Sequence, residues 1–292
     1  MTNDKNPYPF KTKKFDIDGN QLSYVDEGEG KVIVMVHGNP TWSFFYRNLI
    51  KLLRTRYRVI APDHMGCGLS DKPQDYPYRL ADHVANLEKL MDHLQIEKHS
   101  LVLHDWGGAI GMGYAANHHE RIESLVIMNS AAFRSTRIPW RIAVCRLKFL
   151  GPFMVRGLNL FARAALFMAV KKRMSKQVRK GFLAPYNNWQ NRIAVLRFIE
   201  DIPLDIHHPS YESLMKAEGG LDYFKDNPIM ILWGGRDFCF NDSFFDEWKR
   251  RFPKARSIYL ESAGHYLLED ADGEVDHLIT GFLDEYLMAS PE

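Results

Sequence analysis

The chain has 292 residues, of which 46% are hydrophobic and 25% charged, and this ordinary globular composition excludes a disordered chain. Its 38 basic and 36 acidic residues give a net charge of only +2, and its 14 prolines and 20 glycines follow no period, which excludes collagen-like and low-complexity classes. Three scattered cysteines, Cys67, Cys145 and Cys239, fit neither a disulfide framework nor a zinc site, and indicate reduced thiols in a cytoplasmic protein. The N-terminus lacks the apolar core of a signal peptide, and no apolar stretch reaches the ~20 residues of a membrane span.

The charge is distributed unevenly along the chain. Residues 124–199 hold 15 Lys and Arg and no Asp or Glu, so the rest has 23 basic against 36 acidic side chains. A solvated face would give this pattern, and so would a surface that binds something anionic. Within this stretch, residues 168–182 interleave Lys and Arg with apolar residues. We expect them to form a basic amphipathic segment that docks on anionic lipid or on an acidic partner.

The expected elements alternate between strands and helices. Short apolar runs predict buried strands at residues 31–36, 57–61, 100–103, 125–128, 228–233 and 257–260. A helix with one apolar face is expected at 82–95, a second one rich in small residues after the third strand, and a last one near 278–287. The fold class predicted is α/β, with a mostly parallel sheet and helices on both faces.

About a hundred residues between the strands at 125–128 and 228–233 show no strand pattern, and they include the basic stretch. We expect a helical cap at 134–218, inserted into a core formed by residues 1–133 and 219–292. Ligands bind at the carboxyl edge of open α/β sheets, so the site should lie at that edge, beneath the cap.

The strongest signal for chemistry is the run LHDWGG at residues 103–108, which follows a strand and precedes a helix. This context is that of the nucleophile elbow of the α/β-hydrolase fold, with Asp105 in place of serine. A carboxylate at a helix N-terminus is ionised at neutral pH, and its targets are electrophilic carbons that give a covalent ester. We expect Asp105 at a solvent-facing elbow; the alternative is an Asp that only caps the helix.

A nucleophile elbow requires an acid and a histidine later in the chain, in that order. His265 stands in the run SAGHY just after the last expected strand, and Asp237 ends the run GGRD after the strand at 228–233. Asn129, at the end of another strand, cannot supply a carboxylate. A turn role for Asp237 is the alternative to a catalytic one.

Donors for a developing negative charge should come from the residue after the nucleophile and from the loop at residues 37–40. These positions hold Trp106, which also brings an indole N–H, and Asn39, which also brings a side-chain amide. Core packing is the alternative role of Trp106. The Asn39–Pro40 bond in this tight turn is a candidate cis peptide.

Five runs of the sequence resemble the haloalkane dehalogenase branch of the α/β-hydrolases, and the resemblance covers nearly the whole chain: HGNPTWSFFYR, PDHMGCGLSDKP, LHDWGGAIG, WGGRD and AGHYLLED. Within that branch, residues 63–70 and 179–186 look closest to the β-lactone (cis-3-alkyl-4-alkyloxetan-2-one) decarboxylases of bacterial olefin biosynthesis.

The resemblance implies a lyase that converts a long-chain cis-dialkyl β-lactone to a cis internal alkene and CO2. Asp105 is then the nucleophile, His265 the base or proton shuttle, and Asp237 the acid that orients it. Asn39 and Trp106 hold the developing negative charge. The resemblance implies no cofactor and no metal, and association with other enzymes of the same pathway.

Three other functions stay open at this point. A haloalkane dehalogenase would keep the same residues and hydrolyse an alkyl-enzyme ester. An epoxide hydrolase would need two cap tyrosines, for which Tyr186 and Tyr211 are available. A non-catalytic scaffold of the same fold would dock on a membrane or partner, but would have no need of Asp105, Asp237 and His265 together.

For each catalytic alternative the expected ligand is a small hydrophobic molecule, and no nucleic-acid partner is expected. The expected location is cytoplasmic, with peripheral contact to an anionic membrane through the basic cap as a further option. The cap offers apolar residues for a tunnel that would hold the alkyl chains, although ordinary packing of the cap helices accounts for many of them: Phe149, Leu150, Phe153, Met154, Leu158, Leu160, Phe161, Leu166, Phe167 and Met168.

Overall fold

A computed structural model describes residues 6–288 and contains one sheet in the order β1-β2-β4-β3-β5-β6-β7-β8. The six strands from β3 to β8 pair in parallel, and β2 joins β1 and β4 in antiparallel pairs. The strands are β1 (Lys13–Ile17), β2 (Asn20–Glu27), β3 (Val32–Val36), β4 (Arg58–Pro62), β5 (His99–Asp105), β6 (Ile122–Ser130), β7 (Ile229–Gly234) and β8 (Arg256–Leu260).

All six predicted strands are confirmed, and β1 and β2 are an addition that the sequence pattern did not reveal. Every residue of β5 is buried, because a central parallel strand is covered on both faces and therefore reads as a continuous apolar run. By contrast, β1 has the sequence KKFDI and lies at the margin of the sheet with most of its residues accessible. Such an edge strand needs little apolar surface, which explains why it was missed.

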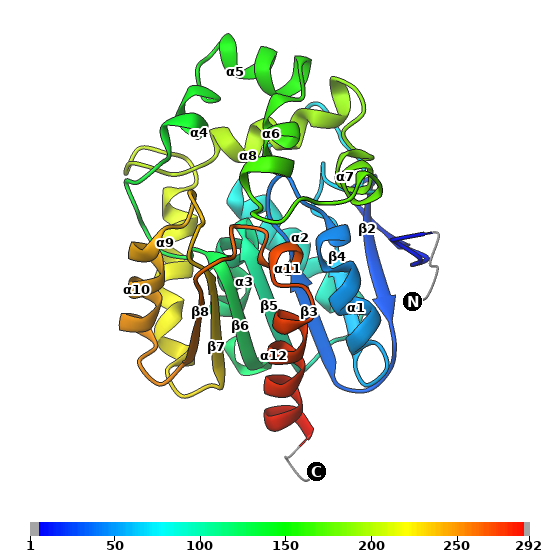
Figure 1. Cartoon of the computed structure of the whole chain (residues 1–292), viewed down its shortest axis with the longest axis vertical. Coiled ribbons are helices and arrows are strands. Elements are labelled where there is room, and N and C mark those ends of the chain that lie inside the picture. Colours follow the sequence, from blue (N-terminus) through cyan, green and yellow to red (C-terminus); the bar gives the residue numbers. More distant parts are fainter. Residues whose placement is uncertain (1–5, 289–292) are drawn as a thin grey trace.

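Helices cover both faces of the sheet (Figure 1). Side chains alternate along β3, so that Ile33 and Met35 enter one apolar cluster while Val34 and Val36 enter the other. The first cluster is closed by α1 (Arg47–Leu53), α11 (Leu267–Asp270) and α12 (Glu274–Leu283). The second is closed by α2 (Leu80–His93), α3 (Trp106–Asn117), α9 (Tyr211–Gly220) and α10 (Asp242–Arg251).

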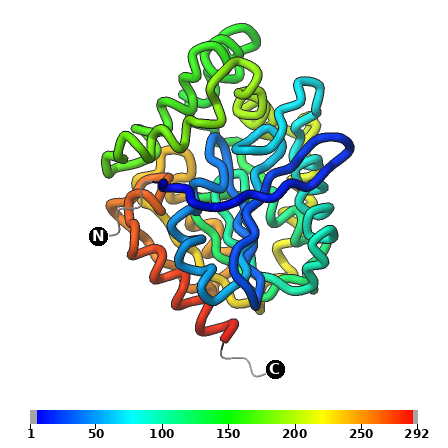
Figure 2. The backbone as a smooth tube through the Cα atoms, turned by 90° about the vertical axis from the view of Figure 1, so that its right-hand side faces the viewer, coloured from blue at the N-terminus to red at the C-terminus, as the bar shows by residue number. Residues whose placement is uncertain are grey.

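A helical cap lies between β6 and β7 in the chain and sits above one end of the sheet (Figures 1 and 2). It contains a π-helix, η3 (Phe153–Gly157), and five α-helices, which are α4 (Trp140–Val144), α5 (Leu150–Pro152), α6 (Leu160–Met168), α7 (Lys176–Leu183) and α8 (Ile193–Glu200).

The expected cap boundary at residue 218 falls inside α9. This helix packs on α3 of the core, and a Cβ added at Gly220 would lie 2.2 Å from Cβ of Ala116. By its contacts α9 therefore groups with the core helices. None of the helices in the described part of the chain is long and apolar enough to cross a membrane.

A buried ion pair joins α1 to α11, the short helix that follows the predicted catalytic histidine. Arg47 Nη2 donates to Glu269 Oε2 at 2.9 Å, and both side chains are less than one-tenth exposed. The guanidinium also lies 4.4 Å from the ring centre of Phe44 and 5.8 Å from that of Phe182 in α7. The pair thus connects the core, the loop that carries His265 and the cap.

We expect Arg47→Met to lower the free energy of unfolding by about 3–5 kcal/mol, because it leaves the Glu269 carboxylate buried and unpaired. Denaturant unfolding followed by circular dichroism measures this change. The double variant Arg47→Met/Glu269→Leu removes both charges and should recover most of the loss. A double variant as unstable as the single one would show that the pair matters for packing rather than for charge.

Candidate active site

Asp105 occupies a sharp turn between β5 and α3, with φ 52° and ψ −126°. Three glycines make this turn possible, because any side chain there would collide with its surroundings. A Cβ at Gly107 would lie 1.9 Å from the Val36 carbonyl oxygen, and one at Gly38 would lie 2.1 Å from Oδ2 of Asp105. At Gly108 it would lie 1.8 Å from Oγ of Ser130. The run LHDWGG therefore forms the predicted elbow.

The structure brings the other two predicted residues together next to this elbow. His265 follows β8 and Asp237 follows β7, and Nδ1 of His265 lies 2.7 Å from Oδ2 of Asp237. Both side chains are buried. The carboxylate fixes the tautomer and the ring orientation of the imidazole, as in the acid–histidine pair of serine proteases.

Sequence reasoning missed the residues that hold this pair. Asn129, rejected as the acid, donates from Nδ2 to Oδ2 of Asp237 at 3.0 Å, and the Cys239 N–H donates to Oδ1 at 2.6 Å. Nε2 of His104 donates to the carbonyl oxygen of His265 at 2.8 Å. The only signal in the sequence was position, since Asn129 and His104 both stand at the carboxyl ends of strands.

Two backbone N–H groups point at the carboxylate of Asp105. The Asn39 N–H donates to Oδ2 at 2.6 Å, and the N–H of Trp106 also bonds to the carboxylate. These are the two backbone positions expected to hold an oxyanion. The expectation of a solvent-facing elbow was wrong, because Asp105 is only 8% exposed and faces a cavity under the cap.

Burial and charge act in opposite directions on the pKa of Asp105. Burial raises the pKa of Asp105 to about 6, although the charge of His265 and the two backbone donors lower it. Burial also opposes a charge on His265, but the carboxylates of Asp237 and Asp105 outweigh it and raise the pKa of that imidazole. At neutral pH the Asp105 carboxylate is therefore mostly ionised, and it lies next to a histidine whose pKa is raised by two carboxylates.

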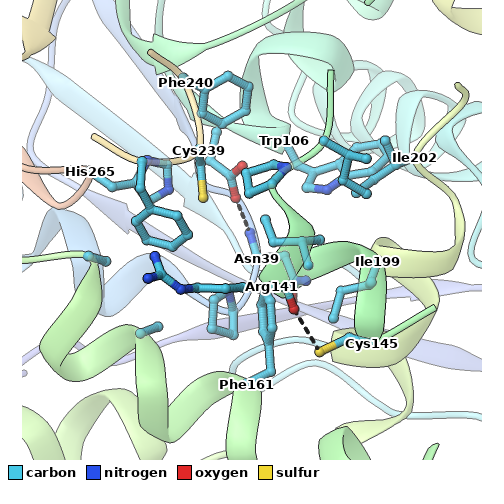
Figure 3. A pocket seen from close by; sticks show the side chains of 18 of the residues that line it. Asn39, Trp106, Arg141, Cys145, Phe161, Ile199, Ile202, Cys239, Phe240 and His265 are labelled. Atoms are coloured by element: carbon cyan, nitrogen blue, oxygen red, sulfur yellow. Dashed lines mark hydrogen bonds between the residues drawn. The ribbon is translucent and has the colours of Figure 1, made fainter. Parts of the chain in front are cut away.

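The side chains of Asn39 and Trp106 lie beside the same cavity (Figure 3). The Asn39 amide donates one hydrogen to the Val195 carbonyl oxygen in α8 at 3.1 Å, so a cap helix fixes its orientation. The Trp106 ring packs against Phe198 of the same helix, with 5.2 Å between ring centres. The Asn39–Pro40 bond is cis.

The cavity has a volume of about 420 Å³ and is lined largely by apolar side chains from both core and cap. Four of the expected tunnel residues line it: Met154, Leu160, Phe161 and Met168. Five others were wrongly placed, because they lie on the outward sides of the short cap segments and are exposed: Phe149, Leu150, Phe153, Leu158 and Phe167. Leu166 is buried within the cap without lining the cavity.

The two tyrosines proposed for epoxide opening do not line the cavity. Tyr186 is buried and donates its hydroxyl to the Thr41 carbonyl oxygen at 3.1 Å. Among residues 6–288 there is also no group of three His, Cys, Asp or Glu side chains that could hold a metal ion. What the arrangement offers is a carboxylate nucleophile, with a histidine–carboxylate pair next to it, in an apolar chamber.

A family model described as the α/β-hydrolase fold matches residues 31–272. The chain therefore belongs to the α/β-hydrolase family.

Within this family the chain is similar to two proteins named cis-3-alkyl-4-alkyloxetan-2-one decarboxylase. The one from Shewanella oneidensis is 44% identical over 284 residues, which cover 95% of this chain and 89% of that protein. The one from Xanthomonas campestris pv. campestris is 41% identical over 291 residues, covering 95% and 97%. The crystal structure of a haloalkane dehalogenase from Bradyrhizobium elkanii has the same fold, with a TM-score of 0.87, 24% identity and coverage of 96% and 100%.

We expect Asp105→Ala to abolish turnover while the protein stays folded. Loss of a nucleophile lowers kcat by more than about a thousandfold. The free energy of unfolding should stay within about 1 kcal/mol of the wild type, because the change also removes a buried charge. Activity assays and denaturant unfolding test both statements. Activity above one part in a thousand, in a folded variant, would argue against covalent catalysis.

The pH dependence of kcat/KM follows from the ionisation of Asp105. Because Asp105 must be ionised and its pKa is about 6, kcat/KM should fall about tenfold per pH unit below pH 6. His265→Gln removes a positive charge that lowers the pKa of Asp105, so the acid limb of the profile should move to higher pH. An acid limb at the same pH in both proteins would contradict this coupling.

Proposed function

We propose that this chain decarboxylates long-chain cis-dialkyl β-lactones to cis internal alkenes and CO2, within hydrocarbon (olefin) biosynthesis. The observation that carries the proposal is the buried carboxylate of Asp105 at the base of an apolar cavity of about 420 Å³. The identities of 44% and 41% with two proteins named for this activity support it, because both extend over almost the whole chain.

The reaction begins with attack by an Asp105 oxygen on the saturated, alkyl-bearing ring carbon that is bonded to the ring oxygen, not on the carbonyl carbon. The bond between that carbon and the ring oxygen breaks, and its electron pair stays on the oxygen as part of a new carboxylate. The product is an alkyl ester of Asp105. Back-side attack leaves the new C–O bond anti to the bond that joins the carboxylate to its carbon.

This anti arrangement is the one that fragmentation requires. The carbon–carboxylate bond breaks, its electrons form the double bond, and Asp105 departs with the electrons of the ester C–O bond. The two alkyl chains remain on the same side, so a cis lactone gives a cis alkene. Neither water nor a net proton transfer is needed, so the balance is one lactone to one alkene and one CO2.

The residues around Asp105 serve both steps. In the second step Asp105 is the leaving group, and its carboxylate returns to the N–H groups of Asn39 and Trp106 that hold it in the free protein. In the first step the new substrate carboxylate forms in a cavity beside His265, whose pKa the carboxylates of Asp237 and Asp105 raise. The apolar walls keep water away from the ester, which favours fragmentation over hydrolysis.

A haloalkane dehalogenase is the second candidate. The observation that favours it is the His265–Asp237 pair, at 2.7 Å, because such a pair can activate water against an alkyl ester of Asp105. The indole of Trp106 and the amide of Asn39 line the cavity as donors for a departing halide. Epoxide hydrolysis lacks such support, since Tyr186 and Tyr211 do not line the cavity.

We expect the wild type to convert a synthetic long-chain cis-β-lactone to the cis alkene with equimolar CO2, and to release little bromide from a long-chain bromoalkane. Gas chromatography of the alkene and halide titration provide the two readouts. Asp105→Ala is the matched control for both substrates. Rapid bromide release without alkene formation would contradict the proposed decarboxylase activity and support the dehalogenase activity instead.

His265→Ala separates the two mechanisms a second way. Hydrolysis needs this base, so a bromoalkane should leave a stable alkyl ester on Asp105, which intact-protein mass spectrometry detects as the added mass of the alkyl group. Fragmentation needs no base, so the β-lactone should leave no lasting adduct on the same variant. Accumulation of a lactone-sized adduct would mean that His265 takes part in release of the product.

We also propose a cytoplasmic location, supported by the three thiols, which form no disulfide in the described structure. Fractionation of cells into cytoplasm, membrane and periplasm tests it.

A further inference from the structure

The outer end of the cap exposes a group of large apolar side chains. We call this group the cap face; it consists of Trp140, Leu147, Phe149, Leu150, Phe153 and Leu158. Phe149 is 84% exposed and Trp140 is 70% exposed. Isolated exposed apolar residues are normal, but a group of this kind on consecutive elements marks a binding surface.

These side chains belong to one packed unit. They come from α4, α5, η3 and the connections beside them, and α5 packs on η3. The end of α4 also packs on α5, since a Cβ added at Gly151 would lie 2.1 Å from the carbonyl oxygen of Cys145. The α5 segment forms the end of the molecule that is most distant from the sheet (Figure 1). The side chains of the cap face are 43% to 84% exposed, even though η3 itself packs on α6 and α8.

Cations lie directly beside these aromatic rings. The Arg141 guanidinium lies 5.2 Å from the ring centre of Trp140, and Nζ of Lys148 lies 5.8 Å from that of Phe149. Neither Arg141 nor Lys148, nor Arg163 on α6, has a carboxylate partner within residues 6–288. The segments that form the cap face carry cations and no carboxylate, because residues 124–199 hold no acidic residue, while Glu200, Asp201 and Asp205 of the following segment lie near Arg146.

The structure divides the expected amphipathic segment at residues 168–182 among the end of α6, a connection and α7, and its docking on lipid or on a partner stays a prediction. The chain leaves α6 at Met168 and enters α7 only at Lys176, and the apolar Val170, Met174 and Phe182 are buried in the protein's own core. This segment has only cations to offer to a partner. The apolar contribution comes from the cap face, which lies earlier in the chain.

The cap face is continuous with the candidate active site. Trp140 and Arg141 line the cavity and are also exposed, and Leu160, two residues beyond Leu158, does the same. Side chains that reach both the cavity and the surface mark an opening. This opening lies at the border of the cap face.

We propose that the cap face seats on the surface of an anionic lipid bilayer, and that the substrate passes from the bilayer through this opening to Asp105. Phe149, Leu150 and Phe153 enter the acyl boundary while Arg141, Lys148 and Arg163 contact lipid phosphates. The substrate part rests on the proposed function, because two long alkyl chains stay in an apolar phase rather than cross water. Lipid is the occupant that matches both features, apolar insertion and an anionic surface without defined shape.

Sedimentation with vesicles tests the docking. We expect the wild type to bind vesicles of phosphatidylcholine mixed with phosphatidylglycerol, and to bind less as salt is added, because screening confines the attraction to about 8 Å at physiological ionic strength. Phe149→Ser/Phe153→Ser and Lys148→Gln/Arg163→Gln should each weaken binding by about tenfold or more.

Matched controls carry equal changes on the core. Met215→Ser/Tyr223→Ser removes two exposed apolar side chains of α9 and of the turn that follows it, and Lys216→Gln/Lys254→Gln removes two charges. These controls should bind as the wild type does. Failure of the wild type to bind, equal losses in the controls, or equal binding to vesicles of phosphatidylcholine alone would overturn the proposal. Saturable binding of the cap face to another enzyme of the pathway, which prevents binding to vesicles, would also overturn the proposal.

A second assay separates docking from chemistry. With a short-chain, water-soluble β-lactone, the cap-face variants should keep the kcat/KM of the wild type, since none of the four changed residues lines the cavity. With a long-chain lactone held in anionic vesicles, the same variants should turn over about tenfold or more slowly. If the wild type leaves the short-chain lactone unchanged, the proposed function fails whatever the vesicles show. If every variant processes the vesicle-held lactone equally well, the docking alone fails.

Discussion

The backbone of Asp105 lies in a conformation that L side chains rarely adopt, and the local packing is arranged to hold it there. Gly38, Gly107 and Gly108 leave no room for a Cβ, and the Ser130 hydroxyl donates to the Asp105 carbonyl oxygen at 2.6 Å. This turn directs the carboxylate away from the sheet, toward two backbone N–H groups and the cavity. A relaxed backbone would direct the side chain elsewhere and leave these donors without their acceptor.

The electrostatics of the site suit the proposed reaction, in which the Asp105 carboxylate must both attack and leave. Burial makes the Asp105 carboxylate more basic, which favours attack, while the N–H of Asn39 and the charge on His265 make it less basic, which favours departure. The resulting pKa of about 6 leaves most of the carboxylate ionised at neutral pH. A dehalogenase faces the same compromise in its first step only, because water then attacks the acyl carbon of the ester. The fate of the ester therefore depends on how well the cap keeps water out.

The parts of this structure that could be predicted from sequence are those set by short-range patterns. The buried parallel strands read as continuous apolar runs, and Asp105, Asp237 and His265 follow strands that must end at one edge of the sheet. The edge strand β1 escaped prediction because such a strand needs little apolar surface. The inner strand β2, whose central residues are buried, was missed as well. Contacts distant in sequence escaped as well: the amide of Asn39 bonds to Val195, 156 residues away, and this bond depends on how the cap docks. The burial of Asp105 was misjudged for the same reason, since the cap, not the local sequence, excludes solvent from the elbow.

The cap also shows why an apolar sequence does not by itself identify the inside of a tunnel. In α6, Phe161 and Met168 line the cavity, while Phe167 on the same helix is 62% exposed. A helix with apolar residues on all sides is usually buried all round. Here one side faces a chamber fitted for alkyl chains, and the other faces outward among cations. Selection for a stable cap in water would favour polar residues at the outward positions, because these side chains stay largely exposed. The inner side of the cap faces the cavity, and its outer side faces the proposed lipid surface. One physical requirement explains both apolar sides: the alkyl chains must remain in an apolar phase from the bilayer to Asp105.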